Sequence, residues 1–139
     1  MLNLTLKLAQ LAKQGVLISH EEVFNEISQQ DDMLTEWAKE HKDMFKKPTL
    51  NQSKTVKEIL KRYPSLIKVD RDYDADPWLI ALAQELKNNS QKTLFEIKRL
   101  IVTEEKIKGN RIRIPFVCKD YGIECIDRIE MFRAEKWSF

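Results

Sequence analysis

Apolar residues recur every three to four positions along most of the chain, which is the spacing of amphipathic helices. Leu4, Leu8 and Leu11 mark a first helix, and Gly15 follows as a residue suited to end it. Val23 and Ile27 mark a second helix. The same spacing predicts further helices over about 31–44, 53–62, 76–86, 114–121 and 127–134.

Between these helices lie short apolar runs that favour extended structure. Residues 16–18 form either a brief strand or a linker, and residues 66–69 form a short extended segment. Residues 94–102 and 123–126 are rich in β-branched residues and predict two strands. Helices separated by short strands imply an α/β layer fold with a mostly parallel sheet. With 139 residues, we expect one domain covering 1–139.

Several helix starts carry polar residues that can bond the unpaired amides of a first turn. Ser19 followed by Glu22 reads as a capping box, and Ser53 and Asp127 are candidate caps of later helices. Asp76-Pro77 is typical of a helix start with Asp as the N-cap and Pro as the first helical residue.

Composition places the chain among globular proteins. Hydrophobic residues make up 42% and charged residues 33%. No apolar run approaches the roughly 20 residues that span a bilayer, and no signal peptide is recognisable, so we expect a cytoplasmic protein with no membrane partner. Cys118 and Cys125 could pair, although the cytosol keeps thiols reduced. With His20 and His41 they make no zinc pattern.

The net charge of +2 conceals an uneven distribution of charged residues. Residues 20–43 hold eight acids against two bases, whereas residues 46–71 hold eight bases against two acids. Residues 87–113 hold eight bases against three acids. Folding could join these segments into an acidic cleft with basic walls, as a metal-dependent nuclease requires. Solvated helix faces explain the same pattern, and charge alone favours that explanation.

The residues that could carry chemistry are acids near the ends of predicted elements. The chain has no glycine-rich phosphate loop and no recognisable Ser/His/Asp arrangement. Asp76 opens an apolar helix, Glu104 and Glu105 follow a predicted strand, and Glu26 lies one helical turn beyond Glu22. Such acids suit a hard metal ion at the carboxyl ends of strands. Each also has a structural explanation: an N-cap, a solvated turn and an exposed helix face.

Four bases directly follow the Glu104–Glu105 pair, and they could hold RNA phosphates beside a metal ion. As parts of an ordinary exposed loop they would need no such role. These bases are Lys106, Lys108, Arg111 and Arg113.

Three segments together resemble PIN domains. Residues 16–27 are similar to the segment that carries a helical glutamate, which is Glu26 here. Residues 76–83 resemble the family's Asp-x-x-Ile-Ala-x-Ala helix, with Asp76 as its acid. Residues 100–105 resemble a strand ending in Val-Thr-x-Asp, with Glu105 matching the acid and Glu104 as an alternate. Residues 37–41 and 114–126 look like a poorly characterised PIN-like branch.

The resemblance implies a PIN-like three-layer sandwich with a short, mostly parallel sheet. It implies a metal-dependent endoribonuclease of the VapC-type toxin–antitoxin kind, with an RNA substrate and an antitoxin protein as partner. Glu26, Asp76 and Glu105 would be the catalytic residues and, with Glu104, would bind Mg²⁺ or Mn²⁺.

One departure from the resembled family bears on activity. PIN domains begin with a strand ending in Asp-(Thr/Ser)-x-(Val/Ile), and here the first acid is Glu21. The resemblance therefore implies a sheet whose first strand is missing and a weak or inactive enzyme. The alternative is a non-catalytic module that binds RNA or a protein. A further alternative is that a homodimer or another chain supplies the strand.

Overall fold

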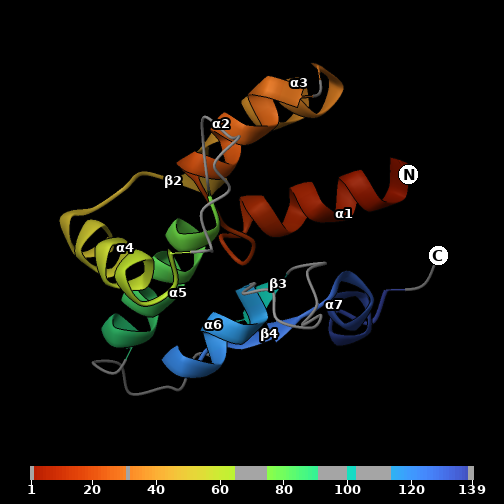
Figure 1. Cartoon of the computed structure of the whole chain (residues 1–139). Helices are drawn as coiled ribbons and strands as arrows, with labels where there is room; N and C mark the ends of the chain where they lie inside the picture. Colours follow the sequence, from red (N-terminus) through yellow and green to blue (C-terminus); the bar gives the residue numbers. More distant parts are fainter. Residues whose placement is uncertain (1, 31, 65–74, 91–99, 103–113, 138–139) are drawn as a thin grey trace.

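The computed structural model describes residues 2–30, 32–64, 75–90, 100–102 and 114–137 (Figure 1). Within these residues the fold is mixed α/β and mostly helical, with seven α-helices, one 3₁₀ helix and four short strands. The elements are α1 (Leu2–Lys13), β1 (Ser19–His20), α2 (Glu21–Gln30), α3 (Asp32–Glu40), the 3₁₀ helix η1 (Lys42–Met44), β2 (Phe45–Lys46), α4 (Leu50–Arg62), α5 (Asp76–Ser90), β3 (Leu100–Val102), α6 (Ile114–Tyr121), β4 (Glu124–Ile126) and α7 (Arg128–Ala134).

The strands pair in parallel, as the sequence predicted, but they form two separate pairs. β1 pairs with β2 so that Ser19 lies opposite Phe45. β3 pairs with β4 so that Ile101 lies opposite Cys125. In the described part of the chain the two pairs are therefore two small sheets, where one sheet was expected. The PIN-like sandwich stays a prediction.

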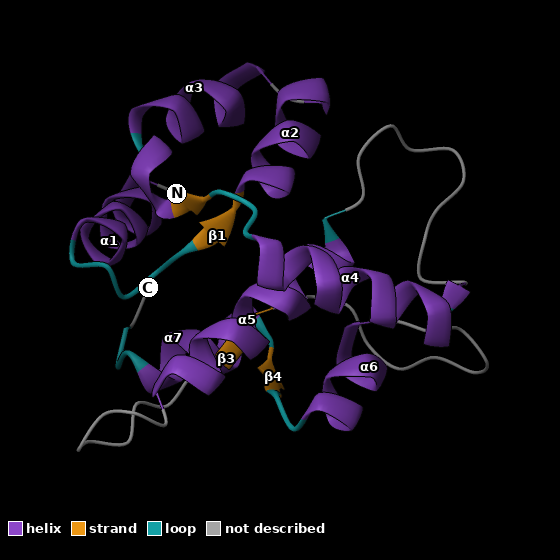
Figure 2. Cartoon of the chain, turned by 90° about the vertical axis from the view of Figure 1, so that its left-hand side faces the viewer, coloured by secondary structure: helices purple, strands orange, loops and turns teal. Residues whose placement is uncertain are grey.

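Helix α5 lies between the two strand pairs (Figure 2). It contacts α4, α6, β1 and β3, and its residues Ile80 and Ala81 are completely buried. A helix surrounded by neighbours must be apolar on several faces, which explains why Trp78-Leu79-Ile80-Ala81-Leu82-Ala83 runs without a charge.

Two hydrophobic clusters form the core of the described residues. One joins α4, α5, β3 and α6 around Ile59, Ile80, Ile101 and Val117. The other lies between α3, η1 and β2, and its buried members are Ala38, Met44 and Phe45, with side chains of α1 and α2 packed against them.

Two glycines end helices, and the sequence predicted this role for Gly15. Gly15 (φ 74°) and Gly122 (φ 65°) both adopt the left-handed conformation that follows a helix C-terminus. After α1, the amide of Val16 donates to the carbonyl of Leu11 at 3.0 Å, and that of Gly15 donates to Ala12 at 3.1 Å. This pattern is a Schellman motif, which satisfies the last carbonyls of the helix.

Helix α7 also begins as the sequence predicted. The Asp127 carboxylate accepts the Glu130 amide at 2.8 Å, and the Glu130 carboxylate accepts the Asp127 amide at 3.3 Å. The two bonds complete a capping box.

Other boundaries differ from the predictions. Helix α4 is capped by Thr49, whose hydroxyl accepts the Gln52 amide, so it starts before Ser53. The predicted helix over 31–44 ends at Glu40, and Phe45 belongs to strand β2. The helix predicted over 76–86 is longer than expected, because α5 runs to Ser90. The extended segment 66–69 and most of the strand 94–102 lie outside the described residues.

We predict that Ile80→Ala lowers the free energy of unfolding by about 2–5 kcal/mol, because it leaves a cavity where α5 meets its neighbours. Leu50→Ala is the control, because Leu50 is 73% exposed and its loss should change stability by less than about 0.5 kcal/mol. Urea unfolding followed by circular dichroism measures both. Equal effects of the two substitutions would show that α5 is not the centre of the core.

Candidate functional site

At the start of α5, the side chain of Glu26 bonds the residue that precedes Asp76. The carbonyl of Ala75 accepts the Leu79 amide at 2.9 Å, which is the first bond of the helix. Ala75 therefore occupies the cap position, and Asp76 is the first helical residue rather than the N-cap that the sequence suggested. The backbone amides at the start of a helix have no acceptor within the helix. Because the Ala75 side chain cannot accept a hydrogen bond, acceptors for the amides at the start of α5 must come from other residues.

Glu26 supplies one of them. Its Oε1 accepts the backbone amide of Ala75 at 3.0 Å, across 49 residues of sequence. The fold thus brings the carboxylate of Glu26, on α2, to the residue that precedes Asp76. Ala75 is 1% exposed, so this bond satisfies an amide that water does not reach.

The electrostatics of a helix start suit these acids. The N-terminus of an α-helix carries a partial positive charge that stabilises nearby carboxylates. Glu26 and Asp76 are both half-buried. They can serve as anionic caps of α5, and their oxygens are also the ligand type that Mg²⁺ and Mn²⁺ prefer. The contact with Ala75 is compatible with both roles.

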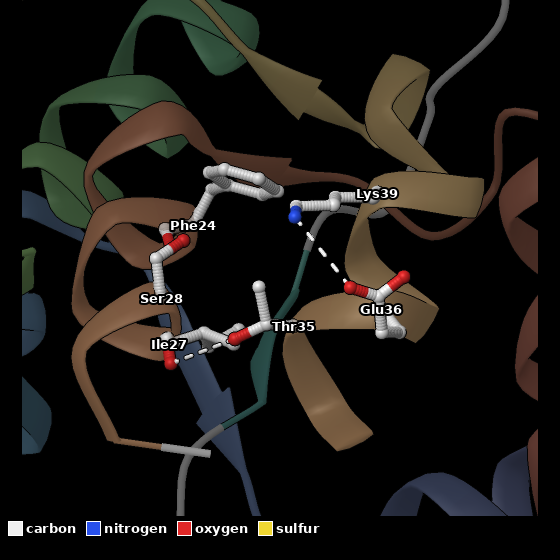
Figure 3. Close-up of polar contacts among 6 residues, drawn as sticks. All are labelled: Phe24, Ile27, Ser28, Thr35, Glu36 and Lys39. Atoms are coloured by element: carbon white, nitrogen blue, oxygen red, sulfur yellow. Dashed lines mark hydrogen bonds and ion pairs between the residues drawn. The ribbon is translucent and has the colours of Figure 1, made fainter. Parts of the chain in front are cut away.

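The orientation of α2 is fixed partly by α3. The Thr35 hydroxyl, from α3, donates to the carbonyl of Ile27 on α2 at 3.2 Å (Figure 3). Figure 3 also shows Ser28, whose hydroxyl donates to the Phe24 carbonyl one turn earlier at 2.8 Å. Because Ile27 directly follows Glu26, the Thr35 contact holds the turn of α2 that carries the carboxylate.

His20 fixes the other end of α2. It is completely buried, and its Nδ1 accepts the Glu22 amide at 3.0 Å, so it caps the first turn of α2. The expected Ser19 capping box is wrong in this respect: Glu22 instead accepts the side-chain amide of Asn25 at 3.5 Å. The His20 ring stacks on Trp78, with 5.2 Å between centroids. The end of β1 therefore lies beside the first turn of α5.

A chain of polar side chains continues from His20, buried at His20 and Gln52 and half-buried at Glu85. Its Nε2 lies 2.9 Å from Oε1 of Gln52, and Nε2 of Gln52 donates to Oε1 of Glu85 at 3.1 Å. The Thr49 hydroxyl donates to the other Glu85 oxygen at 2.6 Å. Burial is the main cause that lowers the pKa of His20 from its ordinary value of 6.5.

This polar chain was not identified from the sequence. The sequence offers His20 only as a zinc ligand or a nucleophile partner, and neither role has support in its pattern. The only local signal is that His20 directly precedes a helix, in the N-cap position. Its partners Gln52 and Glu85 lie 32 and 65 residues further along, so no spacing rule connects them.

The two cysteines are both reduced thiols, with Cys118 buried in α6 and Cys125 half-buried in β4. A hydrogen bond between the two thiols, together with burial, raises the pKa of Cys118. The same bond lowers the pKa of Cys125, because it stabilises the thiolate of that residue.

The remaining predicted site residues lie outside the described residues: Glu104, Glu105, Lys106, Lys108, Arg111 and Arg113. In the part of the chain that is described, no group of three or more His, Cys, Asp or Glu side chains could hold a metal ion. No helix there is long and apolar enough to cross a membrane.

One protein-family model matches nearly the whole chain, and its description names no activity. A family model described as "Domain of unknown function (DUF4411)" matches residues 3–139. The chain belongs to the DUF4411 family. No curated protein and no solved structure matches it. The DUF4411 match includes both Glu26 and Asp76, so the contact between α2 and α5 lies within the family domain.

We predict that Glu26→Ala destabilises the protein by about 1–3 kcal/mol, because the buried Ala75 amide loses its acceptor. Hydrogen exchange at the Ala75 amide should accelerate in the same variant. Glu26→Gln should have a smaller effect, since the Gln side chain keeps an acceptor oxygen.

Glu40→Ala, an exposed substitution on α3, is the control and should leave the exchange of Ala75 unchanged. Unchanged Ala75 exchange in Glu26→Ala would mean that Glu26 does not hold the start of α5 in solution.

Proposed function

We propose that this chain is a PIN-like, metal-dependent endoribonuclease domain in which Glu26 and Asp76 supply two of the metal-binding carboxylates. The observation that supports the proposal is the bond between Glu26 Oε1 and the Ala75 amide. It brings a helical glutamate to the residue that precedes Asp76, and Glu26 and Asp76 are two of the three catalytic acids that the resemblance implies.

The position of these acids in the fold agrees with a ligand site. His20, the last residue of β1, stacks on Trp78 in the first turn of α5. The carboxyl end of a parallel strand therefore lies beside a helix N-terminus. In open α/β folds, ligands bind beyond the carboxyl ends of the strands.

The chemistry of the acids fits the proposed cofactor. Mg²⁺ and Mn²⁺ take oxygen ligands, and Glu26 and Asp76 provide carboxylate oxygens at one helix end. Glu105, with Glu104 as an alternate, would complete the ligand set from beyond β3. When bound, the ion would polarise a phosphate and lower the pKa of a bound water.

The chain's own residues would then hold the metal ion and position the RNA. Glu26 and Asp76 keep negative charge at the start of α5, where the helix dipole favours it. We propose that Lys106, Lys108, Arg111 and Arg113 bind the RNA backbone, which would make binding sensitive to salt.

The residues present also limit the expected rate. The proposed ligand set does not include the first-strand aspartate of PIN domains, and with one carboxylate fewer at the metal we expect low activity. A toxin–antitoxin setting, an antitoxin protein as partner and a cytoplasmic location belong to the same proposal.

The test is cleavage of a labelled single-stranded RNA by the whole chain. We predict cleavage that requires Mn²⁺ or Mg²⁺ and stops with EDTA. Asp76→Asn and Glu26→Gln should each lower the rate roughly 100-fold or more, because each removes a charge that binds the metal.

Asp43→Asn is the matched control, because Asp43 is an exposed acid of η1 and its loss should leave the rate unchanged. Circular dichroism of each variant separates loss of the site from loss of the fold. Salt-sensitive RNA binding without cleavage would contradict the enzyme and favour a non-catalytic RNA-binding module.

A further inference from the structure

The chain of polar side chains from the buried His20 and Gln52 to the half-buried Glu85 has a fixed hydrogen-bond direction. An ionised carboxylate only accepts hydrogen bonds, so Glu85 must face the NH₂ group of Gln52. The Gln52 oxygen must then face His20, at 2.9 Å from Nε2. A carbonyl oxygen needs a donor, so Nε2 of His20 carries a proton.

The other ring nitrogen must therefore be unprotonated in the neutral state. Nδ1 of His20 lies 3.0 Å from the Glu22 amide, which is itself a donor. Neutral His20 satisfies both partners at once, as a donor to Gln52 and an acceptor for Glu22. An imidazolium has two donors and no acceptor, so it would oppose the Glu22 amide.

Loss of this cap has a consequence one turn further along α2. His20 anchors the first turn of the helix, and Glu26 lies one turn further along. Glu26 reaches the Ala75 amide only while α2 keeps its present position, and Trp78, stacked on His20, belongs to the same first turn of α5. His20 therefore contacts both helices that meet where Glu26 bonds Ala75: α2 through the Glu22 amide, and α5 through Trp78.

We propose that His20 is a positioning residue that holds Glu26 at the start of α5 while it is neutral and releases it when Nδ1 is protonated. We call this pH-dependent hold of Glu26 by His20 the latch. The latch itself rests on the contacts described above. Its effect on catalysis rests, in addition, on the proposed function.

The charged groups around His20 set the direction of the pH effect. Glu21 and Glu22, on α2, favour the imidazolium, and Glu85, on α5, acts through Gln52. Lys46, opposite His20 in β2, is exposed. Burial outweighs the acids and lowers the pKa of His20 below 6.5. The stability contributed by neutral His20 is therefore complete above pH 6.5 and is lost as the pH falls below that value.

The experiment is a nitrogen-15 NMR titration of the whole chain from pH 8 to pH 4. At pH 8 the ring nitrogens of His20 should show the tautomer with the proton on Nε2. As His20 becomes protonated, exchange of the Ala75 amide, relative to the intrinsic exchange rate of an unprotected amide at the same pH, should rise about tenfold or more, since a lost hydrogen bond of about 1.4 kcal/mol corresponds to that factor. The two midpoints should coincide.

Three variants make the test specific. His20→Asn keeps a side-chain acceptor for the Glu22 amide but does not titrate, so its Ala75 transition should disappear. His41→Asn, which removes the other histidine, should leave the transition unchanged. Glu21→Gln removes a charge that favours the imidazolium and should move the midpoint to lower pH without disturbing the core.

A transition that persists in His20→Asn would assign it to the Glu26 carboxyl itself and overturn the proposal. A midpoint unchanged in Glu21→Gln would overturn it as well, even if His20→Asn failed to fold. If the Ala75 and His20 transitions coincide but no variant or pH gives RNA cleavage, the proposed function fails and the latch stands.

Discussion

The bond between the Glu26 carboxylate and the Ala75 amide is the contact on which the candidate site depends. It joins α2, in the first half of the chain, to the start of α5. It also gives a hydrogen-bond acceptor to the buried amide of Ala75, a residue whose own side chain has no acceptor. Because the acceptor is a charged group at a helix N-terminus, dipole and hydrogen bond act in the same direction. The same geometry leaves Asp76 next to the bonded amide, so the structural cap and the proposed ligand site share one location.

Helix α5 makes this location possible. Its apolar residues pack into the cluster around Ile59, Ile80 and Ile101, while its first turn stacks Trp78 against His20. The helix is therefore held on one side by the hydrophobic core and on the other by a polar chain that is buried at His20 and Gln52. Buried polar chains of this kind are costly unless every member has a partner, and here each hydrogen bond fixes the direction of the next.

Features governed by nearby residues could be predicted from the sequence. The helices over 2–13, 114–121 and 128–134, the terminating glycines and the Asp127 capping box all depend on spacings of a few positions. The cap by Thr49, the role of His20 and the separation of the strands into two pairs depend on partners far along the chain. The positions of Glu26 and Asp76 on predicted helices made them candidate metal ligands, and the resemblance to PIN domains assigned them to one site. The hydrogen bond between Glu26 and Ala75 depends on partners 49 residues apart, so no local pattern predicts it.

The most direct measurement for the account is a crystal structure of the chain soaked in Mn²⁺, with anomalous scattering recorded to locate the metal. The account predicts Glu26 within hydrogen-bonding distance of the Ala75 amide and a manganese peak about 2.0–2.2 Å from oxygens of Glu26 and Asp76. A map without such a peak, in which Glu26 points away from the start of α5, would contradict it.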